Sequence, residues 1–135
     1  MLTVAALAVS LIGVGGKIGA APKPSETTLC RVLAEPKRYE SRRIVMSGQV
    51  MGGIHGMIVV DPNCPDAAMD LLIDNVILHR NDVWPLFSAI YRGENTAELK
   101  RIDVKIAATF HYAGTKTKRS SVELKRVLDL KIAKP

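Results

Sequence analysis

Two alternating segments near the C-terminus constrain the fold of this chain more than any other feature. Between residues 101 and 112 every second side chain is apolar, and the alternation returns over residues 122–132, with Arg126 and Val127 as exceptions. A period of two places the apolar residues on one face of a strand. The polar, glycine-containing link over residues 113–120 is typical of a hairpin loop. Three apolar residues of the second segment also have helical spacing, but the short link favours two strands.

The hairpin is expected to bury one face and expose the other. Phe110 and Tyr112 share their parity with the apolar row of the first strand, so we predict that both rings pack in the core, with the Tyr112 hydroxyl reaching water. The predicted buried face comprises Ile102, Val104, Ile106, Ala108, Phe110 and Tyr112, then Val122, Leu124, Leu128, Leu130 and Ile132.

Length and composition are those of one globular domain with a substantial core. The chain has 135 residues, of which 47% are hydrophobic and 24% charged. Its 19 Lys and Arg residues against 13 Asp and Glu residues give a net charge of +6. That charge is compatible with anionic partners, including nucleic acid, without selecting one of them.

The N-terminal residues predict export. Residues 2–14 are almost wholly apolar, too few to span a bilayer comfortably, and small residues follow them up to residue 21. We therefore predict a signal peptide over residues 1–20, a mature single domain over residues 21–135, and a periplasmic or secreted protein with no stable membrane span after processing. The alternative is a retained membrane anchor, because no basic residue precedes the apolar run and Lys17 lies in the cleavage region.

Cys30 and Cys64 are the two cysteines of the chain. An even pair in an exported chain predicts a disulfide, which closes a loop of about 35 residues and stabilises the fold by roughly 3–4 kcal/mol in the chain-entropy model. The alternatives are a metal pair or a redox site, which two cysteines so far apart in sequence support poorly.

The order of the remaining elements predicts a barrel. Gly48 in the first strand indicates a bulge or strong bend. Pro36 and Gly93 are expected to end the two helices, and a polar return over residues 94–101 leads to the hairpin. Five strands with a helix between the third and fourth match an OB-fold-like, five-stranded Greek-key barrel. Before the hairpin, the expected elements are a helix over residues 25–35 capped by Ser25, strands over 44–51, 57–60 and 68–73, and a helix from Asn81 or Asp82 to about Tyr91.

Three short segments support this architecture. The stretches over residues 33–39, 44–48 and 63–65 resemble those of small exported bacterial OB-fold proteins of uncharacterised function. The resemblance extends over about residues 29–132. It implies a mainly β fold and an envelope location, and it carries over no catalytic residues.

Nucleic-acid binding is the first function to weigh for such a barrel. OB-folds that bind single strands stack bases on aromatic residues of the second and third strands, and the predicted strands 57–60 and 68–73 contain none. The basic loop residues Lys116, Lys118 and Arg119 could contact phosphates or another ligand. The six aromatic residues lie elsewhere, where we expect core positions: Tyr39, Trp84, Phe87, Tyr91, Phe110 and Tyr112.

The other polar residues form no recognisable catalytic or metal motif. His55, His79 and His111 have no metal-ligand spacing, and the aspartates at 61, 66, 70 and 74 lack the compact calcium-loop pattern. No serine lies in a nucleophile-elbow context, and no glycine loop opens a helix. We therefore predict neither an enzyme nor a bound cofactor or metal.

These observations favour a non-catalytic binding or interaction module of the bacterial cell envelope. Its partner is expected to be a protein or a small ligand of unknown identity. The alternative is an OB-fold protein that binds single-stranded nucleic acid through the basic loop.

Overall fold

A computed structural model describes residues 23–53, 55–91, 101–115 and 117–132. The predicted signal peptide, the helix stop at Gly93, most of the polar return before the hairpin, and Lys116 lie outside these residues. Within the described residues, no helix combines the length and the hydrophobicity needed to cross a bilayer.

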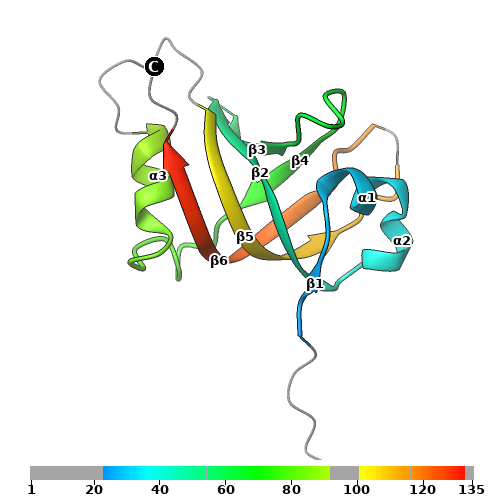
Figure 1. Cartoon of the computed structure of the whole chain (residues 1–135), viewed down its shortest axis with the longest axis horizontal. Helices are drawn as coiled ribbons and strands as arrows, with labels where there is room; N and C mark the ends of the chain where they lie inside the picture. The colour runs from blue at the N-terminus through cyan, green and yellow to red at the C-terminus, as the bar shows by residue number, and fades with distance from the viewer. Residues whose placement is uncertain (1–22, 54, 92–100, 116, 133–135) are drawn as a thin grey trace, which may run out of the picture.

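Five strands close into a barrel (Figure 1). The barrel strands are β2 (Arg43–Gly53), β3 (Gly56–Val60), β4 (Ala68–Leu72), β5 (Arg101–His111) and β6 (Ser121–Ile132). They pair in the order β2-β3-β4-β6-β5, and β5 returns to β2 to close the ring. Only the β4–β6 pair of the ring is parallel. This arrangement confirms the mainly β, OB-fold-like five-stranded barrel.

The N-terminal elements differ from the prediction of one helix starting at Ser25. Ser25–Glu26 instead forms β1, a short strand that pairs in parallel with the beginning of β2. The helix α1 (Leu29–Ala34) is capped by Thr28, whose side-chain oxygen accepts a hydrogen bond from the Arg31 N–H group. The predicted cap at Ser25 is therefore wrong, because a second capping hydroxyl lies nearer the apolar residues of the helix.

Pro36 ends α1 as predicted but also begins a second short helix, α2 (Pro36–Tyr39). A proline fits the first turn of a helix because its missing N–H group has no partner there. The third helix, α3 (Trp84–Tyr91), lies between β4 and β5 as predicted, with Pro85 in its first turn. The described residues thus form three short helices, where the sequence predicted two. In Figure 1 α3 lies at one end of the barrel, and α1 and α2 lie at the other.

The core fills the barrel interior. Phe110, Ile44, Ile106 and Leu124 are fully buried, and Tyr39 also belongs to this cluster. The core position predicted for Phe110 is therefore confirmed. The prediction for Tyr112 is wrong, because β5 ends at His111 and the Tyr112 side chain is exposed.

The aromatic residues of α3 are less buried than expected. Phe87 is half-buried against the core and Tyr91 is exposed. Neighbouring rings follow one another from His79 through Trp84 and Phe87 to Tyr91, with centroid separations of 5.0, 5.7 and 4.8 Å. The core prediction therefore fails for Tyr91. The spacing of these residues was also compatible with a ring series along the outside of the helix.

Of the bulge or bend predicted at Gly48, the β2–β5 pairing shows no bulge, and the bulges of the barrel lie in β6. The β2–β5 pairing passes through Gly48 without a register shift, whereas the β5–β6 pairing shifts twice and leaves Lys125 and Leu128 as extra residues. These two bulges explain why the alternation breaks near Arg126, and why Leu128 is exposed. Gly48 is needed for close packing, because a Cβ atom there would lie 3.0 Å from the Val60 carbonyl oxygen.

Arg80 and Asp82, just before α3, bind the backbone of the bulged strand. Arg80 Nη2 donates to the Lys125 carbonyl oxygen at 2.6 Å, and Asp82 Oδ2 accepts from the Val127 N–H group at 3.0 Å. The two side chains also form an ion pair, with a closest separation of 2.8 Å. Hydrogen bonding to Arg80, above all, lowers the pKa of Asp82 to about 2. This pair therefore supplies partners for backbone groups at the bulges.

Candidate functional site

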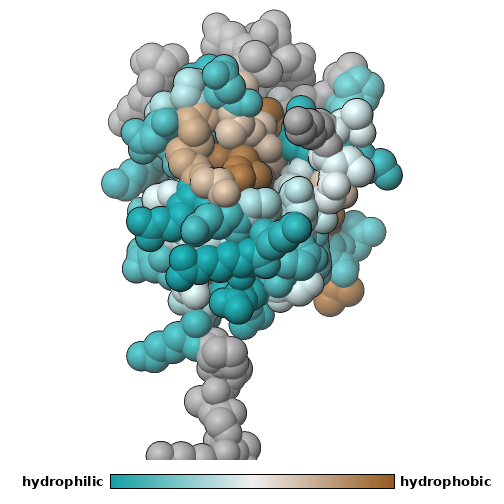
Figure 2. Space-filling view, turned by 90° about the vertical axis from the view of Figure 1, so that its right-hand side faces the viewer, coloured by the Kyte–Doolittle hydropathy of each residue, from teal (hydrophilic) through white to brown (hydrophobic). Residues whose placement is uncertain are grey.

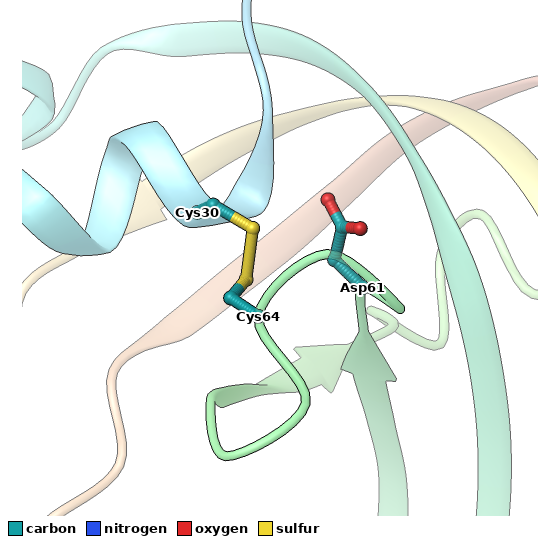
Figure 3. A group of neighbouring side chains, drawn as sticks. All are labelled: Cys30, Asp61 and Cys64. Atoms are coloured by element: carbon teal, nitrogen blue, oxygen red, sulfur yellow. A yellow bond between two sulfur atoms is a disulfide. The ribbon is translucent and has the colours of Figure 1, made fainter.

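The disulfide organises the end of the barrel that carries α1. Cys30 and Cys64 are bonded, with a Cα–Cα distance of 5.8 Å. The bond joins α1 to the link between β3 and β4 (Figure 3). This confirms the predicted disulfide. The metal pair loses support, because both sulfurs take part in the bond and neither is a thiolate.

Asp61, the first residue of that link, is held in a tight turn beside the disulfide. Its backbone carbonyl oxygen accepts a hydrogen bond from the Cys64 N–H group at 3.1 Å. Its side-chain Oδ1 accepts from the Asn63 N–H group at 2.9 Å. Such side-chain turns are a characteristic use of aspartate. The disulfide and the two hydrogen bonds together fix the position of the Asp61 carboxylate.

The Asp61 residue is only 6% exposed. Within the described residues no hydrogen bond other than that from Asn63 reaches its carboxylate, so Oδ2 has no protein partner. No buried side-chain oxygen of the described residues lacks a partner, so Oδ2 is open to solvent. Figure 3 shows the carboxyl group beside the disulfide, with one of its oxygens within 4.8 Å of both sulfurs. A buried carboxylate with one open oxygen is a site for a hydrogen-bond donor.

Asp61 lines a groove on the outside of the barrel, with a volume of about 610 Å³. The β1 segment forms one wall and the turn over residues 61–63 another, while β2, β5 and β6 form the floor. Its volume falls within the usual range for small-ligand sites. Its polar lining residues are Glu26, Thr27, Thr28, Ser47, Gln49, Asp61, Asn63, Asp103, Lys105, Asp129 and Lys131.

The groove follows a stretch of β2 that no outer strand covers. On this edge β1 pairs with Ile44 and Val45, and β3 pairs with β2 only from Gln49 onward. The Val45 carbonyl oxygen accepts a hydrogen bond from the Thr27 N–H group at 2.9 Å, so the backbone of Val45 points to this edge. Because backbone groups two residues apart point the same way in a strand, those of Ser47 face the groove.

Three of the charged side chains in the groove, those of Glu26, Asp103 and Lys105, have side-chain partners within the groove. Lys105 Nζ lies 2.9 Å from Glu26 Oε1, and Gln49 Nε2 donates to Asp103 Oδ1 at 3.1 Å. Across the β5–β6 pair, Asp103 is opposite Lys131 and Lys105 is opposite Asp129. Opposite charges in directly facing positions stabilise a sheet. These pairs hold the floor of the groove in place. Asp61 differs from them, because its side chain is mostly buried while Oδ2 accepts no hydrogen bond from the described residues.

The predicted anion-contact residues lie in a different place. Lys118 is exposed, while Arg119 Nη1 lies 3.0 Å from Asp70 Oδ1 on β4. Both line a second hollow of about 450 Å³, which also includes Leu33 of α1 and Asp66. Figure 2, viewed from the side of the molecule that carries α1 and α2, shows an apolar patch in its upper part and a smaller apolar spot at the lower right, within a mainly hydrophilic surface. The structure therefore places Lys118 and Arg119 together, with one of the two cations already paired.

The histidines do not gather into a metal site. Among the described residues, three potential ligand atoms come within 4.8 Å of one another only at Cys30, Asp61 and Cys64, where the disulfide occupies both sulfurs. His111 Nε2 instead lies 3.4 Å from Glu123 Oε2. Lys125 and then His111 lower the pKa of the Glu123 carboxyl group.

Ser121 is opposite His111 in the strand register, an arrangement with Glu123 that sequence reasoning missed. The structure gives no hydrogen bond between Ser121 and His111 within the described residues. The His111 side chain is 42% exposed, and none of the three residues lines either hollow. This arrangement therefore lacks both the activating contact and the enclosure that nucleophilic catalysis uses.

The comparisons with known proteins give no family: no family model, no curated protein and no solved structure matches this chain.

Proposed function

We propose that this protein is a non-catalytic binding module that works in an oxidising compartment, in the periplasm or outside the cell. The groove beside Ser47 carries this proposal, because the fold fixes a buried carboxylate there and leaves one of its oxygens open. An accessible carboxylate oxygen on a side chain that is already fixed can accept a hydrogen bond from water or from a ligand. The disulfide is compatible with the proposed compartment.

The binding proposal is tested by mapping ligands on the nitrogen-15-labelled, disulfide-bonded protein. A library of small organic fragments with cationic, anionic and neutral members is added while amide chemical shifts are recorded. Binding fragments should move the signals of Ser47, Gln49 and Asn63, which line the groove. If no fragment of any class moves these signals, the proposal is wrong.

The compartment is tested in cells that express the whole chain. Free thiols are blocked at lysis in the cytosolic, periplasmic and medium fractions, and Cys30 and Cys64 are then examined by mass spectrometry. We expect the chain outside the cytosol, with both cysteines resistant to blocking until a reductant is added. A cytosolic protein with two blocked thiols would contradict the export proposal.

Single-stranded nucleic acid is the second candidate, because Lys118 and Arg119 line one hollow at the end of β4. The described residues of β3 and β4 offer no aromatic side chain for base stacking, which ranks this candidate below the groove. Binding of a labelled oligonucleotide is measured at about 50 mM and about 200 mM salt, where phosphate contacts produce a steep loss of affinity. Tight, salt-sensitive binding that disappears in a Lys118→Ala, Arg119→Ala variant would reverse the ranking.

A further inference from the structure

We propose that the groove beside Ser47 binds an organic cation, an ammonium or guanidinium group on a short stem, with Asp61 Oδ2 as its acceptor. This inference deepens the proposed function and rests on it. It names the chemical class of the ligand and the atom that selects that class.

The position of Asp61 is the first argument. The side chain is held by the hydrogen bond from Asn63 to Oδ1, and the turn that carries it is cross-linked to α1 through Cys64. The carboxylate is therefore positioned before any ligand arrives, so binding costs little ordering of the protein. A positively charged donor suits the open Oδ2 best, because charge-assisted hydrogen bonds are the strongest that a carboxylate makes.

The charge of the groove is the second argument. Four carboxylates line it, those of Glu26, Asp61, Asp103 and Asp129, against the ammonium groups of Lys105 and Lys131. With all six groups ionised the groove carries −4 + 2 = −2, whereas the whole chain carries +6. A local excess of negative charge on a basic protein attracts cations to this one place.

The spacing of the carboxylates favours an organic cation over a metal ion. Within the described residues no three carboxyl groups bring their oxygens within 4.8 Å of one another, so the groove offers no compact set of oxygen ligands. Calcium requires six to eight oxygen ligands at about 2.3–2.6 Å. An ammonium or guanidinium group needs only one well-placed carboxylate and a few further acceptors.

Other acceptors and a path for the stem are present in the same groove. The backbone carbonyl group of Ser47 faces the groove between β1 and β3, and Asn63 adds a side-chain amide. Pro62 contributes exposed apolar surface, whereas Met46 and Val104 belong to the buried core beneath the groove. A stem of several methylene groups would pack on Pro62 and on the methylene groups of Lys105 and Lys131 while its charged end reaches Asp61.

The wild-type protein tests the proposal with matched pairs of ligands. Pentylamine is compared with 1-pentanol, and acetyl-Gly-Lys-Gly-amide with the same peptide acetylated at the lysine side chain. Amide shifts and calorimetry give the site and the affinity. We expect each cation to move the Ser47 and Asn63 signals and to bind roughly tenfold or more tightly than its neutral partner, because a hydrogen bond to a charged group is stronger. Binding of the amine alone indicates a small-molecule ligand, and tighter binding of the peptide indicates a basic side chain of a protein.

Asp61→Asn identifies the acceptor. Asparagine keeps the oxygen that receives the Asn63 N–H group but removes the charge, so the turn should be retained. The matched control is Asp74→Asn, since Asp74 accepts the Val76 N–H group in the same kind of turn and lies outside the groove. We expect Asp61→Asn to remove the preference for cations and Asp74→Asn to leave it unchanged.

Two results would overturn this inference. One is equal binding of the charged and neutral ligands by the wild-type protein. The other is an unchanged preference for cations in a folded Asp61→Asn protein. If neutral or anionic fragments still moved the groove signals, the proposed binding function would survive and only its ligand class would be wrong. If no fragment bound there, both would fail. The wild-type comparison decides the question even if Asp61→Asn does not fold.

Discussion

The Arg80–Asp82 pair allows one prediction to be worked out in detail. Asp82 accepts hydrogen bonds from Arg80 Nε and Nη2, at 3.0 and 2.8 Å, and from the Val127 N–H group at 3.0 Å. The change Asp82→Asn keeps one acceptor oxygen but removes the charge that Arg80 pairs with. It should weaken the contact between the segment before α3 and the bulged part of β6.

The magnitude follows from the exposure of the pair. The side chains of Arg80 and Asp82 are 41% and 29% exposed, so the ion pair itself is screened and contributes at most about 1 kcal/mol. The asparagine oxygen can still accept the Val127 N–H group, but it is a neutral acceptor, which weakens this hydrogen bond by about 1 kcal/mol. We expect Asp82→Asn to lower the free energy of unfolding by roughly 1.5–2 kcal/mol at neutral pH.

The lowered pKa of Asp82 determines how the effect of Asp82→Asn on the free energy of unfolding changes with pH. The pKa of Asp82 is about 2 in the folded protein, against an ordinary value of 3.8. A carboxyl group whose pKa is lowered by folding stabilises the protein above its unfolded pKa, and this stabilisation is lost as the pH falls toward the folded pKa. The difference between the wild type and Asp82→Asn should therefore be full above about pH 5 and should shrink between about pH 4 and about pH 2.

Urea denaturation across this pH range measures the difference. The control is Glu35→Gln, which removes a more exposed pair with Arg38, whose side chains are 54% and 65% exposed. That change should alter the free energy of unfolding by no more than about 0.5 kcal/mol. Equal effects of the two substitutions at neutral pH, or a difference for Asp82→Asn that stays constant down to about pH 2, would refute the assigned role of Asp82.

Three further predictions concern packing and the cross-link. Phe110→Ala should cost about 3–5 kcal/mol in a urea melt, because the ring is fully buried, and a well-folded variant of nearly unchanged stability would contradict its core position. Gly52→Ala should cost about 1–3 kcal/mol, because the new Cβ atom would overlap Ile90 Cγ2, and Ile90→Ala should recover part of the loss if the two positions are coupled. Replacing Cys30 and Cys64 by serine should cost about 3–4 kcal/mol, since the bond joins residues 34 apart, whereas a loss under about 1 kcal/mol would contradict its structural role.

Much of the barrel could be predicted because its information is local and periodic. The alternation over β5 requires one buried face, and the polar link to β6 leaves an antiparallel mate as the simplest partner. The interruption of the apolar alternation at Arg126 is visible in the sequence, but its structural cause is not. Two bulges produce it, and the backbone groups near them bind Arg80 and Asp82, which are more than 40 residues earlier in the chain.

The N-terminal segment could not be predicted in the same way. Ser25 and Thr28 are both good capping residues, and the sequence does not say that Ser25 pairs with Ile44 instead. The choice depends on the free edge of β2, which exists only once the barrel has formed. Tyr112 was misplaced for a related reason, since its parity continues the core row although the strand ends one residue earlier.

The groove itself was missed because its residues come from five separate parts of the chain. In the sequence, Asp61 stands out only as one of four spaced aspartates. Nothing in the sequence shows that its carboxylate is buried or that one oxygen stays open. The only local signal was the segment Asp61-Pro-Asn-Cys, in which an aspartate, a proline and a disulfide cysteine indicate a rigid turn.

The most direct test of the proposed binding function is a crystal structure of the disulfide-bonded protein soaked with pentylamine and, separately, with 1-pentanol. The account predicts an ammonium nitrogen about 2.7–3.2 Å from Asp61 Oδ2, with the carbon stem along β2 beside Ser47, and no pentanol at that position. An empty groove, or an amine bound only elsewhere on the surface, would contradict it.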